Sequence, residues 1–106
     1  MINHPLSELL SQTKLLENIA EQHGTPTYVY SKRRLEENIS RLSSAISQSF
    51  KKYQIYYAVK ANSNIQIIRT LKNKFNDLGC DCSSPGELFA ASKAGLIISD
   101  CVYTGN

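Results

Sequence analysis

Apolar residues recur along this chain with two different periods, and the two periods predict different elements. A helical spacing in the first twenty or so residues predicts an amphipathic helix that ends at His23-Gly24. The same spacing predicts a second helix, for which Ser31 is the expected N-cap, and a third one that Ser63 caps. The apolar positions of these three helices are Leu6, Leu9, Leu10, Leu16 and Ile19; Leu35, Ile39, Leu42 and Ile46; and Ile67, Ile68, Leu71 and Phe75.

Short runs of aromatic and β-branched residues lie between these helices and predict strands. The first covers residues 27–30, where Pro26 favours an extended path, and the second covers residues 53–59. Two more are expected at residues 78–82 and 102–104. A helix should separate the last two, because Ser84-Pro85-Gly86-Glu87 is a capping-box pattern and Gly95 ends the apolar run.

From residue 53 onward the order is strand, helix, strand, helix, strand. This order is typical of parallel strands that are joined by right-handed helical crossovers. The sequence therefore predicts an α/β fold from residue 53 to the end of the chain.

Length and charge exclude several classes of function. A chain of 106 residues is at most one small domain, and 42% of its residues are hydrophobic, as in ordinary globular proteins. The net charge of +3 is scattered, and the basic runs Lys32-Arg33-Arg34 and Lys51-Lys52 are too short for a nucleic-acid-binding arm. No apolar run reaches membrane-spanning length, and the N-terminus lacks the pattern of a secretory signal. We therefore expect a cytoplasmic protein with no nucleic-acid or membrane partner.

Three cysteines, Cys80, Cys82 and Cys101, make an odd number without a zinc-type spacing. Reduced, partly buried thiols in a cytosolic protein explain them best. We expect no metal site, because a fourth ligand would have to come from His4 or His23, which are distant in sequence.

Lys60 is the main candidate for chemistry, because it stands where the strand at residues 53–59 gives way to a loop. Side chains alternate along a strand, so Tyr56, Ala58 and Lys60 are expected on one face. An amine beside a small alanine can form a Schiff base with a carbonyl compound. A solvated lysine that merely closes a strand is the simpler interpretation, and the residues by themselves leave both open.

The carboxyl ends of parallel strands meet at one edge, as at the rim of a barrel. The loops that start at Lys60, at Cys82-Ser83-Ser84 and at Gly105-Asn106 should therefore lie side by side. Asp81 is expected to point inward near Lys60, where a carboxylate favours the charged amine; a turn acid is the alternative. Glu87 faces the same rim, although the capping box accounts for it without catalysis.

Four motifs in this order resemble a known family. They are Thr25-Pro26-Thr27-Tyr28-Val29-Tyr30, Tyr57-Ala58-Val59-Lys60-Ala61-Asn62-Ser63-Asn64, Gly79-Cys80-Asp81-Cys82-Ser83-Ser84-Pro85-Gly86-Glu87-Leu88 and Tyr103-Thr104-Gly105-Asn106. Together they are similar to segments of the fold-type III, pyridoxal-phosphate-dependent amino-acid decarboxylases, and most of all to the diaminopimelate decarboxylases. Pro85, where glycine is usual, and Cys82-Ser83 depart from that pattern. The residue pair Cys82-Ser83 is more similar to the ornithine decarboxylases, and a decarboxylase of the ornithine or arginine type is the alternative.

The resemblance implies a fold, a cofactor and roles for individual residues. Residues 25–106 would be the first βα units of a (β/α)8 TIM barrel, incomplete here, and residues 1–24 an N-terminal helical segment. Lys60 would bind pyridoxal 5'-phosphate as a Schiff base, Ala58 would leave room for its ring, and Asp81 would lie close to the lysine. The substrate would be a small amino acid, namely meso-diaminopimelate converted to L-lysine and carbon dioxide, and the parent protein would be a homodimer.

The number of strands limits what the chain is expected to do in isolation. A closed barrel of this kind needs roughly 250 residues, whereas this sequence predicts three barrel strands. We therefore expect the isolated chain to be inactive. A non-catalytic truncated remnant, or an interaction module that pairs through its exposed strand edge, is the alternative from another class of function.

Overall fold

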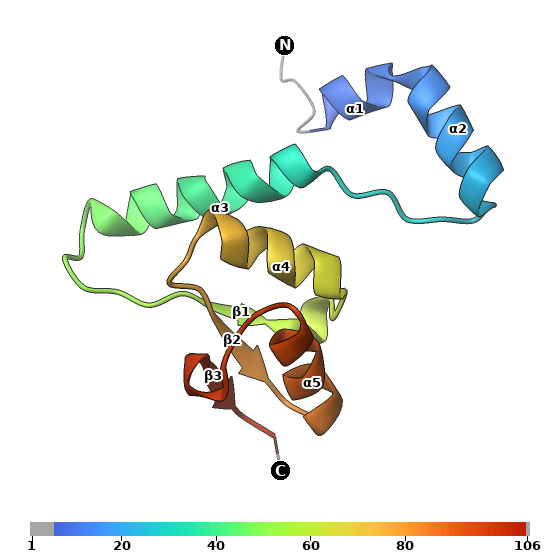
Figure 1. Ribbon diagram of the computed structural model, residues 1–106. Helices are drawn as coiled ribbons and strands as arrows, with labels where there is room; N and C mark the ends of the chain where they lie inside the picture. Colours follow the sequence, from blue (N-terminus) through green and yellow to red (C-terminus); the bar gives the residue numbers. More distant parts are fainter. Residues whose placement is uncertain (1–5, 106) are drawn as a thin grey trace.

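The computed structural model describes residues 6–105, which form a three-stranded parallel sheet with its helices on one side (Figure 1). Residues 1–5, where the first helix was expected to begin, and Asn106, expected to leave the last strand, lie outside the described residues. The elements are α1 (Ser7–Ser11), α2 (Thr13–His23), α3 (Lys32–Ser47), β1 (Tyr56–Ala58), the 3-10 turn η1 (Val59–Ala61), α4 (Ile65–Lys74), β2 (Gly79–Cys82), α5 (Pro85–Lys93), the 3-10 turn η2 (Ile98–Asp100) and β3 (Cys101–Tyr103).

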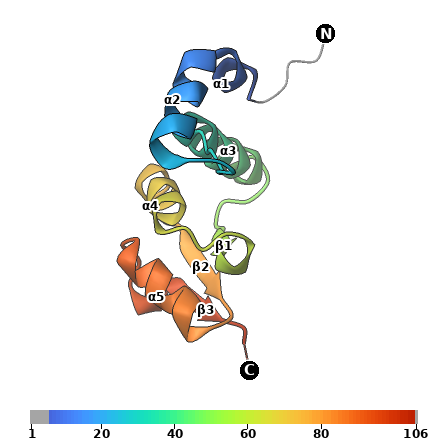
Figure 2. The same ribbon diagram turned by 90° about the vertical axis from the view of Figure 1, so that its right-hand side faces the viewer.

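The predicted strand–helix–strand–helix–strand order is confirmed. The strands lie in the order β1-β2-β3, both pairs are parallel, and Ala58 pairs with Asp81, which pairs with Val102. Figure 2 shows α4 and α5 on the same side of the sheet, with α3 beyond α4 and with α1 and α2 at the far end of the molecule. The other face of the sheet carries no helix from the described residues.

The core lies between the sheet and the helices, in two clusters of buried residues. Ile68 and Leu78 are 0% and 1% exposed, and burying each such side chain contributes about 1.5–3 kcal/mol. The cluster under α4 and α5 contains Val59, Ile68, Cys80, Cys82, Ala90, Ala91, Ala94 and Leu96. The cluster under α3 contains Ile39, Ile55, Ile67, Leu71 and Leu78.

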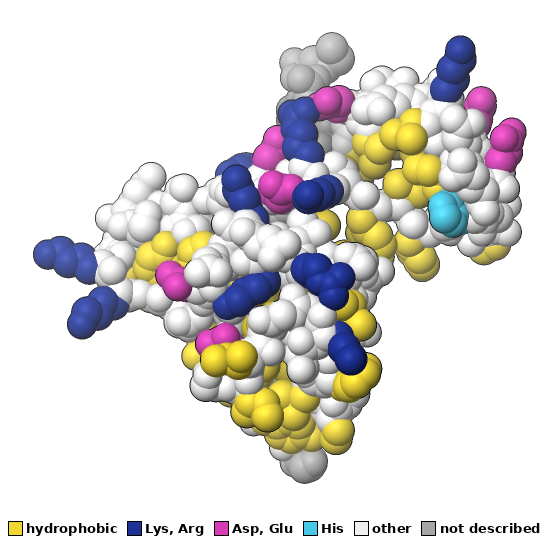
Figure 3. All heavy atoms as spheres, in the orientation of Figure 1, with side chains coloured by type: hydrophobic (Ala, Val, Ile, Leu, Met, Phe, Trp, Pro, Cys, Tyr) yellow, Lys and Arg dark blue, Asp and Glu magenta, His cyan; other side chains and the backbone are white. Residues whose placement is uncertain are grey.

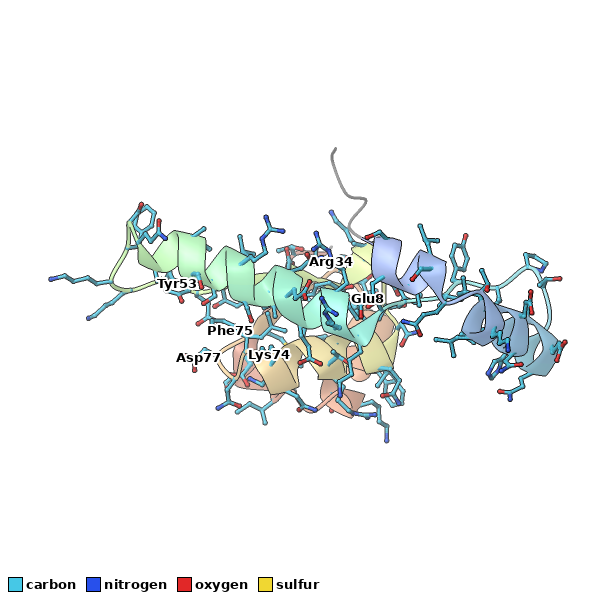
Figure 4. All side chains as sticks on the ribbon, turned by 90° about the horizontal axis from the view of Figure 1, so that it is seen from above. Glu8, Arg34, Tyr53, Lys74, Phe75 and Asp77 are labelled. Carbon is cyan, nitrogen blue, oxygen red and sulfur yellow. The ribbon has the colours of Figure 1, made fainter. Side chains whose placement is uncertain are left out.

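Helix α3 packs on α4 through the second cluster. At one end of this contact Tyr53 and Phe75 stack with ring centroids 6.4 Å apart, and the Tyr53 hydroxyl lies 2.7 Å from the Ser43 hydroxyl (Figure 4). The predicted cap of α3 is confirmed, because Ser31 Oγ accepts a hydrogen bond from the Arg34 amide at 3.2 Å. On the face shown in Figure 3, Lys and Arg side chains are spread among acidic ones, as the scattered charge predicted.

The N-terminal segment forms two helices where one was predicted. Gln12 has non-helical dihedral angles and separates α1 from α2, and Ser11 Oγ donates to the Glu8 carbonyl at 2.7 Å. Such a local side-chain bond competes with the helical pattern, so the apolar spacing did not predict the break. The predicted end at His23-Gly24 is confirmed, and Gly24 has a φ of 79°. Although the spacing is amphipathic, none of the residues of α1 and α2 is buried.

The strand predicted at residues 27–30 is wrong. Residues 24–31 connect α2 to α3 without pairing to any strand of the described sheet, and Tyr28 is 89% exposed. The aromatic and β-branched composition favours an extended backbone, but a strand also needs a neighbour with which to exchange hydrogen bonds.

The helix-start signals after β1 were partly misassigned. Asn64, not Ser63, caps α4, because its Oδ1 accepts from the Gln66 amide at 2.9 Å and the Ile67 amide at 3.4 Å. The capping residue of α5 is Ser84, as predicted, and Gly95 follows this helix with a φ of 107°. Within residues 6–105, no helix is long and apolar enough to cross a membrane.

Candidate functional site at the carboxyl edge of the sheet

The loops that leave the three parallel strands meet at one edge, as predicted for the part that the structure describes. The Thr104 amide donates to the Cys82 carbonyl at 2.9 Å, which continues the pairing beyond β3. Gly105 packs so closely against the Ser83 carbonyl that no side chain would fit on its Cα. The loops after β2 and β3 therefore touch, and the turn that carries Lys60 follows β1 at the same edge.

Lys60 does not sit on a strand. It is the middle residue of the 3-10 turn η1, so β1 ends at Ala58, one residue before the predicted strand end at Val59. The strand ladder ends at Ala58, and Val59, the next residue, is fully buried in the core while Lys60 is exposed. Lys60 makes no hydrogen bond or ion pair with any of residues 6–105. Its amine is thus left without a fixed partner at the rim.

Asp81 lies beside Ala58 in the ladder, on the face of the sheet that the helices leave open. The residue as a whole is half-buried, and its Oδ1 accepts a solvent-exposed hydrogen bond from Thr104 Oγ1 at 2.8 Å. The hydrogen-bond partner of Asp81 is therefore Thr104 and not Lys60. The sequence predicts Thr104 only as the end of the third strand, because a lone threonine after an apolar run gives no signal of this role.

Glu87 closes the start of α5 in a modified capping box. The Glu87 amide donates to Ser84 Oγ at 3.2 Å, as the pattern predicts. The Glu87 carboxylate accepts from the Ser83 amide at 3.1 Å and from the hydroxyls of Ser83 and Ser84 at 2.9 to 3.2 Å. These bonds, led by the Ser83 amide, hold the pKa of Glu87 below its usual value, and the Lys60 charge lowers it further. The Lys60 amine therefore lies within electrostatic reach of the loop after β2.

The open face of the sheet extends from this rim and carries both small and aromatic side chains. Tyr56 and Val102 are 47% and 40% exposed, while Ala58 and Asp81 are half-buried. The Tyr56 ring covers Gly79, where an added Cβ would meet ring atoms at 2.7 Å. Figure 3 shows further hydrophobic side chains at the lower end of the molecule, over α5 and β3. The large exposed apolar residues of that region are Phe89, Ile97, Ile98, Val102 and Tyr103.

The cysteines lie on the opposite, helix-covered side of the sheet. Cys80 and Cys82 are fully buried, Cys101 pairs with Cys80, and all three are free thiols, as predicted. Burial raises the pKa of Cys80 to about 12 and that of Cys82 to about 11. Residues 6–105 contain no group of three or more His, Cys, Asp or Glu side chains that could hold a metal ion; His4 lies outside this range.

The rim offers groups that suit the aldehyde end of pyridoxal phosphate. Lys60 supplies a primary amine that is not paired with any side chain of residues 6–105. Asp81 supplies a carboxylate on the open face. Ala58 supplies a short side chain next to Asp81, which leaves space above the sheet. These residues fit the cofactor's reactive end.

Comparison with known proteins identifies a family that binds pyridoxal. The family model described as "Pyridoxal-dependent decarboxylase, pyridoxal binding domain" matches residues 36–106. The diaminopimelate decarboxylase of Methanothermobacter thermautotrophicus is 40% identical over 88 residues, which are 83% of this chain and 20% of that protein. The enzyme of the same name from Staphylococcus aureus is 38% identical over 91 residues, 86% of this chain and 21% of that protein.

A solved structure, described as the crystal structure of AQ1208 from Aquifex aeolicus, matches with a TM-score of 0.63 and 36% identity. The match covers 86% of this chain and 22% of that one. The chain therefore belongs to the pyridoxal-dependent decarboxylases and is part of their pyridoxal-binding domain. It spans about a fifth of the length of the curated relatives it matches.

Proposed function

We propose that the protein that carries this chain is a diaminopimelate decarboxylase, which converts meso-diaminopimelate to L-lysine and carbon dioxide. The observation that carries the proposal is the similarity to proteins of that name, 31–40% identical over 76–97% of the chain. The complete protein would be a (β/α)8 barrel of which β1, β2 and β3 are the first strands, with residues 1–24 as a separate helical segment, and it would form a homodimer.

Within this proposal Lys60 is the residue to which the cofactor is attached. The Lys60 amine would hold pyridoxal phosphate at the aldehyde carbon of the cofactor. The free amine at the end of β1 supports this role, because a lysine that is already paired would have to break its contacts first. Pyridoxal phosphate, when bound, takes up the electron pair that remains when the substrate carboxylate leaves as carbon dioxide.

Two further residues act on the open face of the sheet. Ala58 leaves room for the cofactor ring, because a larger side chain in this position of β1 would fill the space next to Asp81. Asp81 would supply a carboxylate on the same open face, and its hydrogen bond from Thr104 orients that carboxylate.

Chemical mapping in the full-length protein tests the assignment of Lys60. Borohydride reduction after loading with pyridoxal phosphate, followed by digestion and mass spectrometry, should find the pyridoxyl group on Lys60. Lys52, an exposed lysine on the loop before β1, is the internal control and should remain unmodified. A pyridoxyl group on any lysine other than Lys60 would remove Lys60 from this role.

Substrate assays test the rest of the proposal. The full-length protein should release carbon dioxide from meso-diaminopimelate much faster than from ornithine or arginine, and the isolated 106-residue chain should release none from any of the three. A preference for ornithine or arginine would favour the alternative, a decarboxylase of the ornithine or arginine type. No release by the full-length protein from any of them would favour a non-catalytic protein.

A further inference from the structure

The turn that carries Lys60 is followed by Asn62, whose hydrogen bonds hold the turn in place. All four hydrogen-bonding groups of Asn62 are used: its amide donates to the Val59 carbonyl at 3.1 Å, and its carbonyl accepts from the Tyr57 hydroxyl at 2.6 Å. Its side-chain Oδ1 accepts from the Asn64 amide at 3.1 Å, and its Nδ2 donates to the Tyr30 hydroxyl at 3.0 Å.

The turn needs such support because it is intrinsically weak. A single 3-10 turn of three residues has poor hydrogen-bond geometry and little cooperativity. Lys60, its middle residue, gains nothing from contacts of its own side chain, which is exposed and has no hydrogen-bond or ion-pair partner among residues 6–105. The backbone position of Lys60 is therefore set by neighbours, and Asn62 is the nearest residue with several bonds.

Two tyrosines anchor Asn62 from different directions. Tyr57 belongs to β1 and is half-buried against the core, so its hydroxyl links the turn to the rigid sheet. Burial raises the pKa of Tyr57, which keeps the hydroxyl protonated as a donor. Tyr30 belongs to the connection between α2 and α3, and its hydroxyl links the turn to a segment 32 residues upstream.

We propose that Asn62 is a positioning residue for Lys60, because its side chain ties the Lys60 turn to Tyr30 and to the cap of α4. The proposal rests on the proposed function of Lys60 and adds to it the residue that holds the amine in place. Asn62 touches neither cofactor nor substrate in this role. It keeps the amine at the rim before the cofactor arrives, so that binding does not have to order the turn.

Three variants of the full-length protein isolate the two side-chain bonds. Asn62→Ala removes both, Tyr30→Phe removes only the bond between Nδ2 and the hydroxyl, and the double variant shows whether the two changes act through the same contact. Tyr28→Phe is the matched control, because Tyr28 lies in the same connection, is 89% exposed and makes no hydrogen bond within residues 6–105. Tyr53→Phe controls for losing one tyrosine hydrogen bond elsewhere, since its partner is Ser43.

Two measurements report on the turn and on the cofactor separately. In the absence of pyridoxal phosphate, Asn62→Ala should raise hydrogen exchange of the amides of residues 59–64 about tenfold, as expected for the loss of one or two hydrogen bonds, while amides of β2 keep their rates. The dissociation constant for pyridoxal phosphate should rise by a similar factor. Tyr30→Phe should give a smaller change of the same kind and should add nothing in the Asn62→Ala background.

The possible outcomes separate this inference from the function on which it rests. Unchanged exchange of residues 59–64 in Asn62→Ala, or equal changes in all parts of the protein, would overturn the positioning role. So would an effect of Tyr28→Phe or Tyr53→Phe as large as that of Tyr30→Phe. If borohydride mapping finds the cofactor on another lysine, the proposed function fails whatever the exchange rates are, whereas mapping to Lys60 with unchanged affinity in Asn62→Ala removes only the positioning role.

Discussion

The two edges of the sheet each hold a lysine, and the two lysines are used in opposite ways. At the amino edge, Lys72 Nζ donates to the carbonyls of Asn76 and Leu78 at 2.5 and 3.1 Å and lies 3.8 Å from an Asp100 carboxylate oxygen. Its side chain is only 16% exposed. At the carboxyl edge, Lys60 is exposed and makes no hydrogen bond or ion pair with residues 6–105.

This difference distinguishes a structural lysine from one that is available for chemistry. Lys72 joins the segment before β2 to the segment before β3, so its amine is occupied by structural contacts. A nucleophilic amine must instead be free to lose its proton and to form a bond, which three fixed oxygen partners would oppose. The contrast follows the general rule for parallel barrels, in which the carboxyl edge carries the chemistry and the amino edge carries stability.

Replacing each of the two lysines with alanine gives the largest expected effects. In the full-length protein, Lys60→Ala should lower the rate of decarboxylation by more than about 1000-fold and leave the free energy of unfolding within about 0.5 kcal/mol. Lys72→Ala should do the reverse, lowering the free energy of unfolding by about 1–3 kcal/mol because two carbonyls lose their donor. Chemical denaturation and a carbon dioxide assay measure the two quantities.

Lys93→Ala provides the control for both variants, because Lys93 is exposed on α5 and lies 5.4 Å from the centre of the Phe89 ring. It should change neither quantity appreciably. The comparison fails if Lys60→Ala destabilises the protein as much as Lys72→Ala does, or if Lys72→Ala abolishes activity in protein that remains folded.

The cysteine thiols test whether the helix-covered side of the sheet is shielded from solvent. With a pKa raised to about 12, Cys80 is almost entirely protonated at pH 8, and it is fully buried. Its reaction with a thiol reagent should be more than about 100-fold slower than in urea-unfolded protein, since only the thiolate attacks. Mass spectrometry of quenched samples measures the rate for each cysteine, and equal rates in folded and unfolded protein would contradict the buried arrangement.

The same thiols give a pH dependence with a defined sign. Cys80 and Cys82 ionise near pH 9 when unfolded but only near pH 12 and 11 when folded. Their contribution to stability is therefore fully present below about pH 9 and is lost as the pH rises through the folded values. The urea midpoint should fall over this range, and replacing both cysteines with alanine should reduce that fall.

The sequence predicted the helices and the parallel order well, because these depend on local signals. The apolar spacing of α3 and α4, the Ser31 cap and the Ser84 capping box each act within a few residues. Gly24 and Gly95, which end helices with positive φ values, are equally local signals. The strand order then followed from the alternation of elements.

What the sequence missed depends on contacts between distant residues. The strand expected at residues 27–30 lacked a partner, and the turn at Val59–Ala61 replaced a strand end because Asn62 is bonded to Tyr57 and Tyr30. Neither effect can be derived from local propensity. Asn64 and Ser63 were equally good caps by residue type, and only the loop geometry distinguishes them.

The smallest expected effect concerns the hydrogen bond between Asp81 and Thr104 at the carboxyl edge. Because this contact is exposed to solvent, Thr104→Val should lower the free energy of unfolding by only about 0.5–1 kcal/mol, whereas Thr104→Ser keeps the hydroxyl and should cost less. If Asp81 serves the amine of Lys60, Thr104→Val should still weaken pyridoxal phosphate binding, because the carboxylate loses its orientation. Denaturation and cofactor titration on the same two variants check this, and a loss of stability without any loss of affinity would make the contact purely structural. In that case Lys60 would be the single functional group of the rim, and the comparison with Lys72 would concern one residue and not a whole edge.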